Sequence, residues 1–164
     1  MTGQEQSWSR SSVTVERAAK ELLRRMDAAA DLIAFTEYTF RAYQTAEIHR
    51  IIASQLERVE QGEVDRLMLH VPPRHGKSEL ASRRFPAYYL GKHPERQFIS
   101  ASAGVTLAED FGRDVRNIKA GPQYACLFDT RLAEDSQARG RWNTSQGGAY
   151  FAAGVGSQVM GRGA

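Results

Sequence analysis

The sequence predicts an α/β fold, in which short apolar strands alternate with helices and further helices precede them. A short apolar run at Arg66–Val71 predicts a buried strand, and further strands are predicted at Gln97–Ser102, Arg141–Thr144 and Ala149–Ala153. Segments with apolar residues at helical spacing separate several of these strands. The order strand, helix, strand, helix is typical of α/β domains.

The N-terminal third of the chain predicts helices. Residues 1–12 are polar, and we expect them to be disordered or loosely held. An amphipathic helix that packs against the rest of the domain is predicted next by Val15, Ala19, Leu22, Leu23, Met26, Ala30 and Ile33. A second helix, ended by Gly62, is predicted by Ile48, Ile51, Ile52, Leu56 and Val59. We therefore divide the chain into a loose N-terminus (1–12), a helical segment (13–62) and an α/β core (63–164).

Two helices are predicted within the core. The segment after Ser78 has helical character but contains Pro86, which predicts a short or kinked helix. The clearest helix follows Gln97–Ser102, because Thr106 and Glu109 have the spacing of a capping box. Its apolar face is predicted to contain Ala108, Phe111, Val115 and Ile118, and Gly121–Pro122 to end it.

The composition is that of a soluble globular domain, or of part of a larger protein, with 164 residues, 41% hydrophobic and 25% charged. No apolar run is long enough to cross a bilayer, and the polar N-terminus has no signal-peptide core, so we expect a cytoplasmic protein. The net charge of +3 permits contact with a polyanion without requiring it. The pairs Arg24–Arg25 and Arg83–Arg84 are interpreted as solvated helix faces.

Cysteine and histidine give little indication of chemistry. The single cysteine, Cys126, excludes an internal disulfide, and we interpret it as a buried or partly buried thiol. The four histidines lack ligand spacing with cysteine or carboxylate residues, so a structural zinc site is not predicted.

The segment "HVPPRHGKS", residues 70–78, ends like a phosphate-binding loop. In such a loop, backbone N–H groups and a helix N-terminus surround the anion, lysine reaches the outer phosphates, and a hydroxyl binds magnesium. Gly76, Lys77 and Ser78 fit these roles, and they lie between a predicted strand and a helical segment. The sequence therefore predicts a nucleotide site here.

The entry to this loop departs from the usual pattern. The leading glycine would stand at Val71, and Pro72 and Pro73, which follow it, have no N–H group to donate. Arg74 and His75 would then bring donors to the edge of the phosphates. The alternative interpretation is a basic surface turn between a strand and a helix.

Several blocks in order resemble the large subunit of bacteriophage terminases, the ATPase motors that package viral DNA. The first is "RLMLHVPPRHGKSELASRRFPAYYLGKHPERQFISASAG", and "LAEDFGRDVRNI" and the segment from Tyr124 to Ala164 follow it. The resemblance covers roughly residues 43–164. It implies an incomplete three-layer P-loop NTPase fold of the ASCE type, with ATP and magnesium as ligands. Terminases often have a basic residue and proline in place of the leading glycine.

The resemblance also implies roles for single residues. Gly76, Lys77 and Ser78 would contact phosphate, with Ser78 also binding magnesium, and Arg74 would be the loop's basic residue and a γ-phosphate sensor. Lys77 and Arg74 are thus the predicted catalytic residues. The segment with Tyr43, Gln44 and His49 lies where such motors often hold adenine, although simple packing explains these side chains equally well.

The implied partners are those of a packaging motor: double-stranded DNA, the small terminase subunit and the portal of the procapsid, in the host cytoplasm. A ring of identical subunits is implied for the full-length protein. Two alternatives stay open, another P-loop motor such as a helicase and a module that binds nucleotide without hydrolysing it.

Hydrolysis also requires a carboxylate on magnesium at the end of an apolar strand. The nearest segment, "YACLFDT", ends at Asp129 and is short, and Leu132–Asp135 is not predicted to be a buried strand. In terminases this strand comes after the segment with which the present chain ends, and a nuclease domain follows. We therefore expect little or no ATP turnover, open edges on both sides of Arg66–Val71, and marginal stability.

Overall fold

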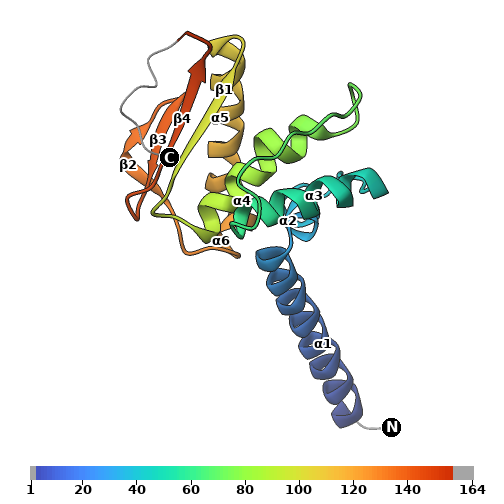
Figure 1. The fold of residues 1–164 in the computed structure, drawn as a ribbon. Helices are drawn as coiled ribbons and strands as arrows, with labels where there is room; N and C mark the ends of the chain where they lie inside the picture. The colour runs from blue at the N-terminus through green and yellow to red at the C-terminus, as the bar shows by residue number, and fades with distance from the viewer. Residues whose placement is uncertain (1–2, 157–164) are drawn as a thin grey trace.

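The computed structural model describes residues 3–156, and the side chains of 14–134 and 138–156 within that range (Figure 1). Its helices are α1 (Gly3–Ala30), α2 (Leu32–Thr39), α3 (Glu47–Glu60), a π-helix η1 (Glu79–Arg84), α4 (Phe85–Lys92), α5 (Val105–Ala120) and α6 (Pro122–Ala125). Its strands are β1 (Gln97–Ser102), β2 (Leu132–Gln137), β3 (Arg141–Thr144) and β4 (Ala149–Gly154). The predicted α/β class is confirmed.

The four strands form one mixed sheet in the order β1-β4-β3-β2. β1 and β4 are parallel, with Gln97 opposite Ala149, and the other two pairs are antiparallel. The predictions for β1 and β3 match the observed bounds, and β4 extends one residue beyond its prediction. β2 contains the Leu132–Asp135 segment; it is an edge strand, in agreement with the prediction that this segment is not a buried strand.

Three aromatic rings join the sheet to α5. Phe98 of β1 stacks on Tyr150 of β4 with ring centroids 5.8 Å apart, and Trp142 of β3 stacks on the same tyrosine at 5.0 Å. The indole N–H of the fully buried Trp142 donates a hydrogen bond to the Gly112 carbonyl of α5. Helix α5 therefore covers one face of the sheet, with Val115 also fully buried.

The ends of α5 test two predictions. Gly121 is the C-cap, as predicted, but the N-cap is Gly104 and no side chain caps the helix. The predicted capping box at Thr106 and Glu109 is therefore wrong. Because the helix begins at Val105, Thr106 already lies inside the first turn, where its hydroxyl is not placed to cap the helix N-terminus.

A second cluster of aromatic side chains lies among α2, α4 and the segment after α6. It contains Phe35, Tyr88, Tyr124 and Phe128, with ring centroids between 5.1 and 6.3 Å apart. The segment "YACLFDT" therefore belongs to a helix and a turn and not to a strand. Cys126, which we expected to be at least partly buried, is exposed, because α6 directs Tyr124 inward instead.

Helix α1 corrects the interpretation of its apolar residues. It includes residues 3–12, which we expected to be loose, and it extends away from the rest of the molecule (Figure 1). Val15, Leu22, Leu23 and Met26 are 58–68% exposed, so the predicted packing of this stripe against the domain is wrong.

A group of polar side chains connects α1 to α2. The Tyr38 hydroxyl of α2 donates to the Glu21 carboxylate at 2.6 Å, and Arg25 donates to the same carboxylate and to Tyr38. A hydrogen bond from the Ala34 N–H to Asp31 caps the start of α2, so Ile33 belongs to this next helix and is buried there. The break at Asp31 therefore separates the exposed stripe from the core.

The extended segment 66–71 corrects a second prediction. Leu67, Leu69 and Val71 are half-buried against the core, whereas Met68, between them, is 78% exposed. This alternation is that of a strand, yet no strand within residues 3–156 pairs with the segment. The prediction of a buried strand is therefore wrong, because side-chain alternation does not by itself supply a partner for the backbone.

None of the helices described in residues 3–156 combines the length and the apolar character needed to span a membrane. Residues 157–164, which end the predicted core, lie outside the described part of the chain.

Candidate functional site

The predicted phosphate loop forms the wall of a cavity of about 400 Å³. Its lining residues are contiguous and include every loop residue that the sequence predicted: Val71, Pro72, Pro73, Arg74, His75, Gly76, Lys77, Ser78 and Glu79. The cavity lies where the extended segment 66–71 gives way to a helix. This is the position at which a phosphate loop is expected.

The loop backbone has the geometry of a tight turn into a helix. Arg74 and Gly76 have φ angles of 64° and 74°, in the left-handed region that glycine adopts without strain. The Leu80 N–H donates to the Gly76 carbonyl at 3.1 Å, and helical structure is continuous from Lys77 to Lys92. The N–H groups of a helix's first turn have no partner within the helix, so those after Gly76 are available to an anion.

Two cations face this cavity without a carboxylate partner. Lys77 is half-buried and Arg74 is exposed, and neither forms an ion pair with any residue in the described range 3–156. Ser78 is exposed, and its hydroxyl caps no backbone group. Within the described part of the chain, two positive charges without an ion pair and a hydroxyl that caps no backbone group therefore line the cavity.

His75 lines the cavity with one ring nitrogen already engaged. Its Nδ1 lies 2.8 Å from the Pro73 carbonyl oxygen, which can only accept a hydrogen bond. The proton is therefore on Nδ1, and a neutral His75 presents an acceptor at Nε2. In that state His75 stiffens the loop and does not donate to a phosphate.

Two of the residues assigned to adenine, His49 and Tyr43, lie close to the loop, but none of the three lines the cavity. The His49 ring lies against Gly76: a Cβ placed on that glycine would stand 2.6 Å from Nε2. Tyr43 packs on His49 with ring centroids 5.3 Å apart, and its buried hydroxyl has no hydrogen-bond partner among the residues that the structure describes. Burial raises the pKa of Tyr43 to about 12. Neither these residues nor the exposed Gln44 lines the cavity, so this geometry does not test an adenine role.

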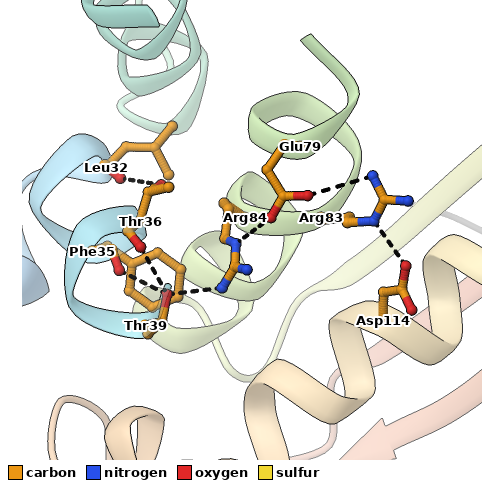
Figure 2. A network of polar contacts seen from close by, with 8 residues as sticks. All are labelled: Leu32, Phe35, Thr36, Thr39, Glu79, Arg83, Arg84 and Asp114. Carbon is orange, nitrogen blue, oxygen red and sulfur yellow. Dashed lines mark hydrogen bonds and ion pairs between the residues drawn. The ribbon is translucent and has the colours of Figure 1, made fainter. Parts of the chain in front are cut away.

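Behind the loop, Glu79 is shared by two arginines (Figure 2). Its carboxylate accepts from Arg84 Nε at 2.7 Å and lies 3.5 Å from Arg83 NH1. Arg83 also forms an ion pair with Asp114 of α5 at 2.8 Å, and Arg84 donates to the Thr39 hydroxyl of α2 at 3.0 Å. The network therefore ties the helix behind the loop to both α5 and α2.

This network corrects the interpretation of the arginine pair as a solvated helix face. Arg84 is only 8% exposed, and its guanidinium lies over the Phe40 ring at 5.0 Å. The pattern of the sequence could not show this, because Arg83 and Asp114 are 31 positions apart. Glu79, which we did not predict as a site residue, is the only acidic side chain lining the cavity among the described residues.

The π-helix agrees with the predicted irregularity at Pro86. The Phe85 N–H donates to the Leu80 carbonyl five residues before it, and Pro86 has no N–H to continue an α-helical ladder. The helix therefore changes from π to α just where proline removes a donor. Single π-turns inside helices are frequent at functional sites.

No group of three or more histidine, cysteine or acidic side chains that could hold a metal occurs among the described residues. Ser78 is thus the only predicted magnesium ligand in this cavity. Comparisons with models of protein families, with curated proteins and with solved structures found no match to the chain.

Proposed function

We propose that the cavity formed by Val71–Glu79 binds the phosphates of ATP. The observation that carries the proposal is the placement of Lys77 and Arg74, two cations with no ion-pair partner in the described range, around a loop that leads into a helix N-terminus. Both cations line one cavity, where the half-buried Lys77 and the exposed Arg74 can reach the same ligand. Cations, free N–H groups and the helix dipole all favour an anion at this point.

Each residue of the loop has a distinct role in this proposal. Gly76 permits the left-handed turn, so that the following N–H groups point toward the phosphates. Lys77 reaches the outer phosphates, and Arg74 approaches from the exposed side. Magnesium, bound with ATP, would supply charge neutralisation between the phosphates, and the free hydroxyl of Ser78 fits as its protein ligand.

We propose further that this nucleotide site belongs to the P-loop ATPase part of a terminase large subunit, in which ATP hydrolysis drives the translocation of double-stranded DNA. The ordered sequence blocks of residues 43–164 support this, together with a loop that departs from the common pattern by the same proline and basic residues. The α/β fold with a mixed sheet is compatible with such an ATPase. Magnesium, DNA, the small subunit and the portal are the partners that this proposal implies.

One observation favours a second candidate, a module that binds nucleotide without hydrolysing it. Glu79, the single acidic residue lining the cavity within the described range, is held by Arg83 and Arg84. Both of its oxygens are already engaged by guanidinium groups, so the geometry leaves neither of them free to accept from a water molecule. Binding without turnover is therefore the behaviour that the described residues support most directly.

Titration calorimetry with Mg·ATP tests the proposal. We expect the wild type to bind and Lys77→Ala to bind about 10–100-fold more weakly, because a charge-assisted contact contributes roughly 1.5–3 kcal/mol. Lys20→Ala is the matched control, since Lys20 lies on α1, away from the cavity, and pairs with Glu16 across an exposed helix face. Equal affinities of wild type and Lys77→Ala would contradict the proposal.

A hydrolysis assay on the same proteins separates the two candidates. Turnover that requires magnesium and disappears in Lys77→Ala supports the ATPase. Binding without turnover supports the non-hydrolysing module.

A further inference from the structure

The imidazole of His49 supports the phosphate loop from outside the cavity. A Cβ built on Gly76 would stand 2.6 Å from His49 Nε2 and 3.1 Å from Cδ2, so the edge of the ring occupies the side-chain position of this glycine. His49 is not among the residues that line the cavity. It therefore contacts the turn that a ligand would use without facing the ligand itself.

The orientation of this ring is fixed by helix α3. The Ala46 N–H donates to His49 Nδ1 at 3.1 Å, which is the side-chain half of a capping box. Since Nδ1 accepts, the proton of the neutral ring is on Nε2, the nitrogen that faces Gly76. The ring is thus anchored at one edge to the start of α3 and applied at the other edge to the loop.

Aromatic contacts also connect His49 to Glu79, the residue that follows the loop. Tyr43 packs on His49 at 5.3 Å and on Phe40 at 6.2 Å. Phe40 in turn lies under the guanidinium of Arg84, which binds Glu79 at the end of the loop. Gly76 in the loop and Glu79 just after it are therefore both connected to one segment, residues 40–49.

We propose that His49 is a positioning residue of the phosphate loop, which holds Gly76 in its left-handed conformation and so aims the following N–H groups into the cavity. This inference rests on the proposed binding of ATP. The loop lacks the leading glycine and contains two prolines without N–H groups, so few backbone donors are available and their direction matters. Within residues 3–156, segment 66–71 gives the loop no strand ladder on its entry side, and His49 supplies a fixed contact instead.

The test compares His49→Asn with His49→Ala. The Asn Oδ1 takes the place of imidazole Nδ1, so His49→Asn keeps the hydrogen bond from Ala46 but removes the ring edge on Gly76, whereas His49→Ala removes both. We expect both variants to bind Mg·ATP about 10-fold more weakly than the wild type, equivalent to about 1.4 kcal/mol. His49→Ala should lower the midpoint of urea unfolding further than His49→Asn does, because both lose the ring contact with Tyr43 and only His49→Ala also loses the hydrogen bond from Ala46.

A residue that only caps α3 would give a different result. His49→Asn would then bind Mg·ATP like the wild type, and this outcome overturns the inference. If the wild type itself does not bind Mg·ATP, or if Lys77→Ala binds equally well, the proposed function fails instead.

Limited proteolysis without nucleotide provides the independent readout. Trypsin cleaves after Arg74 and Lys77, and cleavage there should be faster in His49→Asn than in the wild type, with cleavage after Arg58 unchanged. Equal rates at the loop would contradict a positioning role for His49, whatever the affinity for ATP.

Discussion

Two extended segments have similar sequence patterns and different outcomes. Gln97–Ser102 forms β1, with a parallel ladder to β4 and a ring of Phe98 stacked on Tyr150. Residues 66–71 alternate between exposed and half-buried more regularly than β1 does, but they pair with no strand in the described part of the chain. Alternation therefore specifies an extended chain and its buried face, whereas pairing depends on a second strand that local sequence does not specify.

Two lysines next to these segments also differ, one in α5, which covers the sheet, and one in the loop that follows residues 66–71. Lys119, at the end of α5, is 4% exposed and donates to the Tyr124 hydroxyl at 2.6 Å, and burial lowers its pKa to about 7. Lys77 borders an open cavity and has no ion pair among the described residues. Lys119 is therefore used inside the fold, whereas Lys77 is left available to a ligand.

The largest loss of stability is expected in the sheet. Trp142→Ala removes a fully buried ring that stacks on Tyr150 and donates to Gly112, so it should lower the free energy of unfolding by about 3–5 kcal/mol. Urea unfolding followed by circular dichroism measures this. A loss below about 1 kcal/mol would show that the sheet does not depend on the aromatic stack.

A smaller effect should separate the two faces of the unpaired segment. Leu69→Ala removes a half-buried contact with the core and should cost about 1–2 kcal/mol. Met68→Ala is the matched control on the neighbouring exposed position and should stay within about 0.5 kcal/mol of the wild type. Equal losses from both substitutions would mean that the segment is buried on both faces, as a central strand is.

The buried Lys119 should make the stability of the protein depend on pH. The pKa of Lys119 is about 7 in the folded protein, against 10.5 for an ordinary lysine, so between these values the unfolded chain binds more protons. Stability relative to Lys119→Met should therefore rise with pH, by at most about 1.4 kcal/mol between pH 7.5 and 8.5. The cost of the buried charge is fully present below pH 7, and parallel pH profiles of the two proteins would contradict this burial.

Much of the fold followed from local pattern. The bounds of β1 and β3 and the end of α5 at Gly121 were predicted because apolar alternation, helical spacing and glycine act over a few residues. The exposed stripe of α1 was missed because its polar side, with Glu21 and Arg25, makes the contact with α2 instead. No periodicity indicates which face of a helix finds a partner.

The same distinction between local pattern and distant contacts applies to the candidate site. Residues 74–78 are contiguous in the sequence, so their common cavity could be predicted from a short motif. The contacts that hold the loop come from distant positions: His49 on Gly76, and the path from Glu79 through Arg83 to Asp114. Such contacts depend on the packing of α2, α3 and α5, which a single sequence does not give.

Hydrogen exchange with and without Mg·ATP tests the central claim most directly, because it observes the backbone groups that should hold the phosphates. Without nucleotide, we expect slow exchange in β1 and fast exchange in both the unpaired segment 66–71 and the loop. Mg·ATP should slow exchange at Gly76, Lys77 and Ser78 in the wild type and not in Lys77→Ala. Binding of ATP that leaves exchange at these three residues unchanged would contradict the phosphate loop.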